Sequence, residues 1–429
     1  MSMGVLTKDG LGRNALWMLV GMGLRLVIQA LYFVEIARSL GAVNYGAFVG
    51  VVALVGIAFP FGALGSGNQL VKNVSRDRSL FPTCWGAALA TIGIFSSLLL
   101  GLVLLVSHLL LPAAIPLRLV LLVAGADLFG LSVVTVSGQA FQAVEQLNWT
   151  AAINVLFSAA RLAGAVVLIR SNSHPSALQW GHLYFWASIA VAVSAFVLVC
   201  IRLGAPRLAR PRTFAEMREG FYFSASLSAQ TVYNDIDKTM LARLSSLDAA
   251  GIYGAAYRLI DVSFVPVSAV LYSTYPRFFR EGARGISASF AYARPLLLRA
   301  LGYSSAVCAV LLLSAGLIPR IIGAEYAQSA EALRWLAPLP ILKGLHCFLS
   351  DSLTGAGHQP LRTKLQAGVA AFNILINLWI IPAYSWRGAA WSSLASDGLL
   401  ACAMGTAVYF LSHGAPAALP DAAANAECT

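Results

Sequence analysis

Continuous apolar stretches, separated by short polar segments, make up most of this chain. Each stretch is about 20 residues or more, long enough to cross the hydrocarbon core of a bilayer as an α-helix. None shows the strict alternation that a membrane β-strand requires. The pattern predicts about twelve transmembrane helices, over residues 14–36, 43–66, 83–107, 117–138, 149–170, 182–203, 220–242, 251–275, 294–316, 333–354, 365–384 and 388–412.

Composition and charge agree with an all-α integral membrane protein. The chain is 59% hydrophobic and only 11% charged, against about 25% charged in soluble domains. The net charge of +11 comes from Lys and Arg in alternate loops, a bias typical of the cytoplasmic side. We therefore expect both termini in the cytoplasm and no nucleic-acid partner. The six cysteines have no metal or redox spacing, so we expect no metal site.

The predicted helices divide into two sets of six around a basic, proline-containing loop. We expect an N-terminal lobe over residues 1–205, a linker over 206–218, a C-terminal lobe over 219–412 and a disordered tail over 413–429. A short repeat supports two related lobes: Tyr45-Gly46-Ala47-Phe48 recurs at a fixed offset as Ala250-Gly251-Ile252-Tyr253. Pseudo-symmetric lobes of this kind hold a central cavity between them.

Several charged residues interrupt the apolar stretches. Each costs about 2.5–3.5 kcal/mol at the centre of a bilayer, so they must face one another or a wet cavity. The interrupting residues are Arg25, Arg161, Asp235, Asp237, Lys238, Arg258, Asp261 and Lys343. A helical bundle with charges inside is typical of a transporter, and the excess of cations indicates an anionic cargo.

The sequence also resembles a known family over nearly its whole length. The segments that carry the resemblance are IARSLGAVNYGAF, ALGSGNQLVKNVSRD, YNDIDKTMLARLSSLDAAGIYGAAYRL, YPRF and Gly323-Ala324-Glu325-Tyr326. They are similar to segments of the Wzx-type oligosaccharide flippases of bacteria, which belong to the superfamily of the multidrug-and-toxin extruders and the lipid II flippase. The resemblance implies a two-lobed inner-membrane protein. Its cargo would be an oligosaccharide on undecaprenyl pyrophosphate, moved by alternating access for lipopolysaccharide or exopolysaccharide synthesis.

With that cargo in view, the buried cations are candidate pyrophosphate ligands, because guanidinium binds phosphate oxygens in a two-point fork. Arg25, Gln29 and Tyr32 share one helical stripe, at i, i+4 and i+7. The predicted cargo-binding residues are Arg25, Gln29, Tyr32, Arg161, Arg258 and Lys343. In the alternative interpretation, each Arg only pairs with a carboxylate, such as Glu35 or Asp127, to hold helices together.

The remaining charges are predicted to balance the cations or to take up a coupling ion, H⁺ or Na⁺. This predicted network consists of Asp235, Asp237, Lys238, Asp261, Glu35 and Asp127. Asp235 with Lys238, and Arg258 with Asp261, are i, i+3 neighbours that can also neutralise each other locally. No other cofactor is expected. The expected partners are membrane lipids and the polymerase and chain-length machinery of polysaccharide synthesis.

Two other functions stay open. A cation-coupled multidrug extruder has the same fold, but cationic drugs favour an acidic, aromatic cavity over one rich in Arg and Lys. A membrane polymerase or ligase for the same glycans would be an enzyme, and we expect such an enzyme to carry a sizeable outer loop with catalytic residues. Every predicted outer loop is short, which favours a transporter without catalytic residues.

Overall fold

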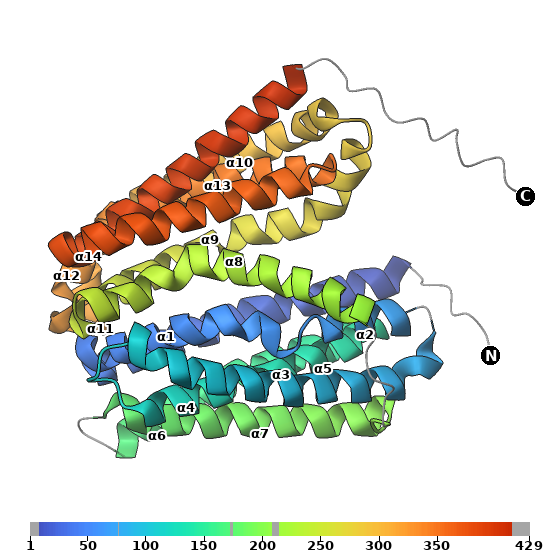
Figure 1. Cartoon of the computed structure of the whole chain (residues 1–429), viewed down its shortest axis with the longest axis horizontal. Helices are drawn as coiled ribbons and strands as arrows, with labels where there is room; N and C mark the ends of the chain where they lie inside the picture. The colour runs from blue at the N-terminus through green and yellow to red at the C-terminus, as the bar shows by residue number, and fades with distance from the viewer. Residues whose placement is uncertain (1–7, 76, 172–174, 208–213, 414–429) are drawn as a thin grey trace, which may run out of the picture.

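The computed structural model describes residues 8–75, 77–171, 175–207 and 214–413. Within these ranges every regular element is a helix (Figure 1), which confirms the all-α prediction. The predicted tail lies almost wholly outside the described residues, as does the centre of the predicted linker. The helix bounds that follow fix where the charged side chains lie.

The first half of the chain forms α1 (Lys8–Gly62), α2 (Ser66–Val74), the short η1 (Arg78–Leu80), α3 (Phe81–Leu110), α4 (Leu117–Gly125), the π-helical η2 (Ala126–Leu131), α5 (Ser132–Ala143), α6 (Leu147–Ser171) and α7 (Ala177–Leu203). The second half forms α8 (Phe214–Leu244), α9 (Leu247–Gly282), α10 (Ile286–Ser314), η3 (Ala315–Leu317), α11 (Ile318–Ile322), η4 (Ala324–Tyr326), α12 (Ala327–Leu336), α13 (Leu339–Gly355) and α14 (Gln359–His413).

The predicted apolar stretches fall on helix, except that 43–66 and 333–354 include the turns at 63–65 and 337–338. Eight helical segments of the described chain are long and apolar enough to cross a membrane. Two of the eight, Gly23–Val74 and Gln359–His413, have 52 and 55 residues, far more than the roughly 20 that one crossing needs. Each of these includes two of the predicted stretches. The more polar α8 is not among the eight, nor is the predicted stretch 333–354, which is divided between α12 and α13. The membrane fold is confirmed, whereas the number of twelve crossings stays a prediction.

The two long helices reverse direction at a single residue. In α1 this residue is Gly41, whose φ of 68° and ψ of 170° lie in a region that glycine enters without strain. A Cβ there would lie 2.3 Å from a carboxylate oxygen of Glu325. That carboxylate accepts a hydrogen bond of 3.1 Å from the backbone N–H of Ala42. In α14 the break falls at Ser385, with φ 53°.

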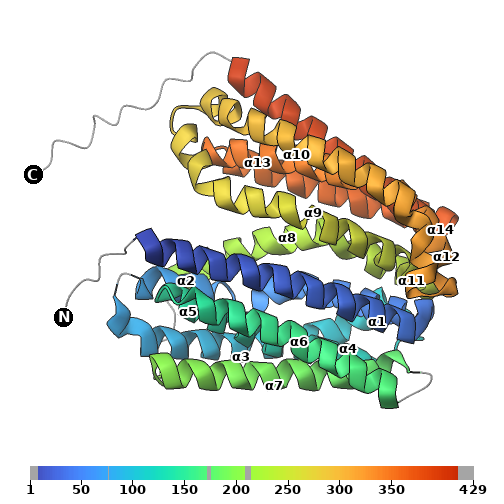
Figure 2. The same ribbon diagram turned by 180° about the vertical axis from the view of Figure 1, so that it is seen from behind.

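The two halves of the chain converge at one end of the molecule and diverge at the other (Figures 1 and 2). We call the convergent end, which holds α11, α12 and the breaks in α1 and α14, the closed end. The open end is where α1 begins and α14 finishes. In both views the first and last described residues therefore lie at the open end.

Helix α8 lies between the halves and packs along the second part of α1. The Ser224 and Ser228 hydroxyls donate to the carbonyls of Pro60 and Ile57, at 2.8 and 2.7 Å. Nearer the closed end, the hydroxyl of Thr239 donates to the carbonyl of Gly50 at 3.0 Å. Helix α8 thus belongs to the second half by sequence but follows the first half over most of its length.

The glycines of the sequence repeat, Gly46 and Gly251, hold the closed end together. A Cβ on Gly46 would lie 1.7 Å from the carbonyl oxygen of Leu247, and one on Gly251 would lie 2.0 Å from that of Ala42. Real Cβ atoms essentially never approach other atoms within 3.0 Å, so only glycine permits this crossing of α1 and α9. The Tyr326 hydroxyl adds a hydrogen bond of 2.9 Å to the carbonyl of Ala37.

Candidate functional site

A cavity of about 310 Å³ lies between the two halves, at the lower end of the usual size for small-molecule sites. Helix α1 forms one wall and α8 and α9 form the other, while α6 and α7 add one residue each. The lining residues are Tyr32, Phe33, Ile36, Tyr45, Phe48, Val49, Val52, Ala53, Gly56, Arg161, Tyr184, Asp235, Lys238, Gly254, Arg258 and Asp261. The fold therefore brings six of the twelve predicted site residues to one surface.

The two walls differ in chemistry although the repeat relates them. At the repeat's offset, Ala53 and Gly56 of α1 correspond to Arg258 and Asp261 of α9. All four residues line the cavity. The first half therefore presents small and aromatic residues where the second half presents charges, and the one charged lining residue from the first half, Arg161, comes from α6.

Arg161 is held by the first half's own helices. Its guanidinium forms an ion pair of 2.9 Å with Asp127, and the Tyr184 hydroxyl donates to the same carboxylate oxygen at 2.8 Å. The guanidinium carbon also lies 4.2 Å from the ring centre of Phe157 and 3.9 Å from that of Tyr184, a distance at which cation–π attraction contributes. Arg161 is thus both paired with a carboxylate and part of the cavity wall.

Arg25 and Arg258 have no such partner. In the described chain no carboxylate lies within ion-pairing distance of either guanidinium. The charges of Arg161 and Arg258 nevertheless each act on that of Arg25. Arg161 and Arg258 thus line the cavity, with Arg258 unpaired, whereas Arg25 is exposed on α1, lines neither cavity and is also unpaired.

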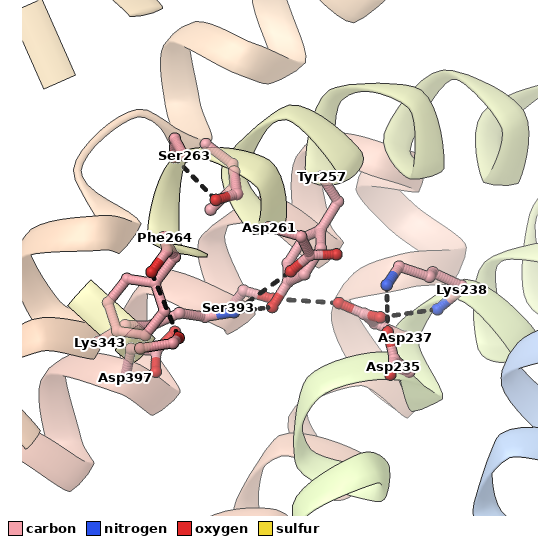
Figure 3. Close-up of polar contacts among 12 residues, drawn as sticks. Asp235, Asp237, Lys238, Tyr257, Asp261, Ser263, Phe264, Lys343, Ser393 and Asp397 are labelled. Atoms are coloured by element: carbon pink, nitrogen blue, oxygen red, sulfur yellow. Dashed lines mark hydrogen bonds and ion pairs between the residues drawn. The ribbon is translucent and has the colours of Figure 1, made fainter. Parts of the chain in front are cut away.

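The other two cations are paired across the second wall (Figure 3). Lys238 forms an ion pair with Asp235, and the ammonium of Lys343 lies 4.0 Å from Asp261. The ring of Tyr257 lies beside both ammonium groups, with its centre 4.1 Å from Lys238 and 4.6 Å from Lys343. Lys343 also donates to the Tyr257 hydroxyl at 2.7 Å. Both lysines are 7% exposed, so these partners stabilise charges that are largely removed from water.

Of the two local pairs expected from the sequence, only Asp235 with Lys238 is formed. Arg258 and Asp261 form no ion pair in the described chain, and Asp261 faces Lys343 on α13 instead, the alternative of pairing across helices. The expected alternative pairing of Arg25 with Glu35 is also not formed. Glu35 is exposed and lines no described cavity, because ten residues of helix place it about 15 Å further along α1. Gln29 is half-buried on α1 and does not line the cavity either.

Asp237 lines neither cavity, although the charges of Lys238 and Asp235 act on it. It accepts hydrogen bonds from the Tyr253 hydroxyl and, at 3.1 Å, from the Ser393 hydroxyl. The reason is helical geometry, because residues two apart point about 200° away from each other and Asp235 faces the cavity. Asp237 instead joins α8, α9 and α14.

A second cavity, of about 300 Å³, continues from the first into the second half of the chain. Asp235 and Asp261 line both cavities, and Lys343, His346 and Arg362 line only the second. His346 lies 2.9 Å from the carboxylate of Asp397 on α14. Asp397 escaped the sequence analysis, although an acid inside an apolar stretch is the same signal that identified the others.

The sequence of residues 11–281 matches the model of a family described as "Polysaccharide biosynthesis protein". The match covers more than half of the chain. The chain belongs to this polysaccharide biosynthesis protein family. No curated protein matches the sequence.

Solved structures with the fold of this family member are membrane transporters. An inward-facing multidrug resistance transporter of the MATE family, in the MOP superfamily, aligns with a TM-score of 0.73 and 14% identity over 91% of this chain and 99% of that one. The lipid II flippase MurJ, in an inward closed conformation, aligns with a TM-score of 0.72 and 11% identity over 91% and 87% of the two chains. An outward-facing MATE transporter scores 0.64, with 14% identity over 94% and 97%.

The family match and the apolar helices establish a multi-pass membrane protein of the polysaccharide biosynthesis family. At identities this low the structural likeness shows the fold alone. The function of this family member must therefore be inferred from the chemistry of its cavity.

Proposed function

We propose that this protein flips an oligosaccharide linked to polyprenyl pyrophosphate from the cytoplasmic to the outer leaflet of a bacterial inner membrane. The flipped glycan serves lipopolysaccharide or exopolysaccharide synthesis. The observation that carries the proposal is the charge balance around the cavity. Five cations lie in or beside it, three have a carboxylate partner, and Arg25 and Arg258 have none in the described chain.

An unpaired charge in a bilayer costs about 2.5–3.5 kcal/mol on the milder scale, so two unpaired guanidinium groups favour a ligand that supplies two negative charges. A pyrophosphate esterified at both ends carries one negative charge on each phosphate. Arginine suits it because the planar guanidinium donates two parallel hydrogen bonds and is only weakly hydrated. A cationic drug would instead add to the existing excess of positive charge.

Alternating access supplies the movement. The cavity lies beside a crossing of α1 and α9 that closes one end, while the halves diverge toward the end where the described chain begins and finishes (Figures 1 and 2). The positive-inside bias assigns that open end, and both termini, to the cytoplasm. Cargo then enters from the cytoplasm, and the closed end must part to release it.

A coupling ion completes the cycle in this proposal. Asp235 and Asp261 line both cavities and pair with Lys238 and Lys343. The arriving pyrophosphate competes with these carboxylates for the lysines, and uptake of H⁺ or Na⁺ by the displaced carboxylates offsets their loss. The polymerase and chain-length machinery of polysaccharide synthesis would receive the flipped product.

The experiment that tests the proposal measures surface glycan in cells whose own gene is replaced by variants. Arg25→Ala and Arg258→Ala should each abolish display at normal protein level, while Arg25→Lys and Arg258→Lys keep part of it, because Lys retains the charge without the fork. Arg284→Ala is the matched control, since that exposed side chain pairs with Glu281 outside the cavity. Normal display by both Ala variants would refute the assignment.

A further inference from the structure

Two tyrosines of the cavity have hydroxyls without a protein partner. Tyr32 and Tyr45 both line the cavity, and in the part of the chain that the structure describes neither phenol oxygen forms a hydrogen bond. By contrast, the hydroxyls of Tyr184, Tyr257 and Tyr326 each bond to a protein group. Buried phenols normally find partners, so these two hydroxyls are available to a ligand.

Their position makes one small site of them. Tyr45 is only 6% exposed, so its free hydroxyl is enclosed by protein except where it meets the cavity. The two phenols lie close enough to interact electrostatically with each other and with Arg258. The ring of Phe33, which also lines the cavity, lies 5.9 Å, centre to centre, from that of Tyr45. The site combines aromatic rings, two hydroxyl groups and the guanidinium groups of Arg258 and, beside Tyr32, Arg161.

We infer that this corner of the cavity binds the sugar ring directly attached to the pyrophosphate. A pyranose presents hydroxyls around its edge and C–H groups on its faces. The C–H groups pack on the negative face of an aromatic ring, and free phenols exchange hydrogen bonds with the hydroxyls. The inference rests on the proposed function, because it places the sugar relative to the pyrophosphate bound by Arg25 and Arg258.

The order of groups along α1 agrees with the order of groups in the cargo. Tyr32 lies seven residues beyond Arg25, about 10 Å nearer the closed end at 1.5 Å per residue. Tyr45 follows the reversal at Gly41 and lies nearer still to the closed end. A cargo that enters sugar first from the open end therefore meets the tyrosines with its sugar while its phosphates lie among the arginines.

The size of the cavity limits how much of the glycan can bind beside Tyr32 and Tyr45, in what we call the sugar subsite. About 310 Å³ is at the lower end of ligand-pocket volumes, which suits the first sugar and not a whole repeat unit. The rest of the glycan must occupy the space between the diverging halves. We expect discrimination at the first sugar and tolerance beyond it.

The test compares two soluble probes on the purified full chain, farnesyl diphosphate and farnesyl-diphospho-N-acetylglucosamine, by isothermal titration calorimetry. The variants are Tyr32→Phe, Tyr45→Phe and the double variant. Because neither hydroxyl has a protein partner, these changes should leave folding intact. Tyr409→Phe on α14 is the control, because Tyr409 is 59% exposed and does not line the cavity.

Each lost hydroxyl should weaken binding of the glycosylated probe by about twofold to tenfold, and the double variant by about tenfold or more. Binding of farnesyl diphosphate should change by less than about twofold, and Tyr409→Phe should change neither. Equal losses for both probes, or no loss for the glycosylated one, would overturn the subsite and leave the proposed function standing. If the wild-type chain bound neither probe, the proposed function would fall and the subsite with it.

Discussion

The crossing of α1 and α9 at the closed end leads to a quantitative prediction for Gly46→Ala. In the proposed alternating access, this crossing forms in the state that opens toward the cytoplasm and parts in the state that opens outward. A residue that hinders only the crossing should therefore shift the balance between the two states without touching the cavity's charges. Gly46 is such a residue, since the atoms nearest a Cβ there belong to Leu247 and Gly251.

The structure sets the size of the effect. The added Cβ would lie 1.7 Å from the Leu247 carbonyl oxygen, whereas ordinary van der Waals contact begins at 3.4 Å, so the helices must separate by about 1.7 Å. Backbone atoms cannot turn aside as a flexible side chain can. Overpacking of this kind costs about 1–3 kcal/mol, and since 1.36 kcal/mol is tenfold in an equilibrium constant, the closed crossing should lose about 5-fold to 150-fold in relative population.

The assay is labelling of a single cysteine by a membrane-impermeant maleimide. Val49→Cys, in a chain with its six native cysteines replaced, places a thiol on the cavity wall. In intact cells the maleimide reaches the thiol from the closed end, and Gly46→Ala should speed this labelling by about 5-fold to 150-fold if the outward-open state is rare in the unchanged chain. In inverted vesicles the maleimide reaches the thiol from the open end, and Gly46→Ala should slow this labelling. Gly23→Ala is the control, because a Cβ on Gly23 of the same helix meets nothing within 4 Å. Unchanged labelling from both sides in Gly46→Ala would refute the reasoning.

Two further predictions separate structural from cargo-binding charges. Arg161→Ala or Asp127→Ala alone should destabilise the fold by about 3–5 kcal/mol, because each leaves a buried partner unpaired, whereas the double change Arg161→Met with Asp127→Leu should be nearly neutral. Thermal unfolding in detergent measures the stability of each variant. A double variant no more stable than the single ones would contradict the prediction that the pair is structural. Asp237→Ala should lower stability by about 1–3 kcal/mol, because it leaves the Tyr253 and Ser393 hydroxyls without their shared acceptor. Unchanged unfolding of Asp237→Ala would show that these hydrogen bonds contribute nothing.

The apolar stretches predicted the helices because helix length and hydrophobicity are local properties. Pairing of Asp235 with Lys238 was also predictable, since three residues of helix place them on one face. The direction of Asp237 follows from the same geometry, two residues from Asp235. Local rules thus describe each helix well, including which charges share a face.

Contacts between distant helices were beyond those rules. Asp261 has Arg258 at i−3, and nothing local indicates that Lys343, 82 residues on, is its partner instead. The segment Gly323–Tyr326 was recognised by resemblance, but its role in joining α11 and α12 to the reversal of α1 depends on the tertiary fold. The free hydroxyls of Tyr32 and Tyr45 are likewise a property of the packed structure, because sequence does not show which phenols find partners.

Flipping by the purified protein in liposomes tests most directly whether the unpaired arginines carry a lipid-linked sugar pyrophosphate. The liposomes would contain a fluorescent polyprenyl-diphospho-N-acetylglucosamine, and a membrane-impermeant quencher would report how much of it changes leaflet. We predict rapid exchange with the wild-type chain and with Arg284→Ala, and exchange no faster than in protein-free liposomes with Arg25→Ala combined with Arg258→Ala. Exchange at the wild-type rate in that double variant would contradict the account.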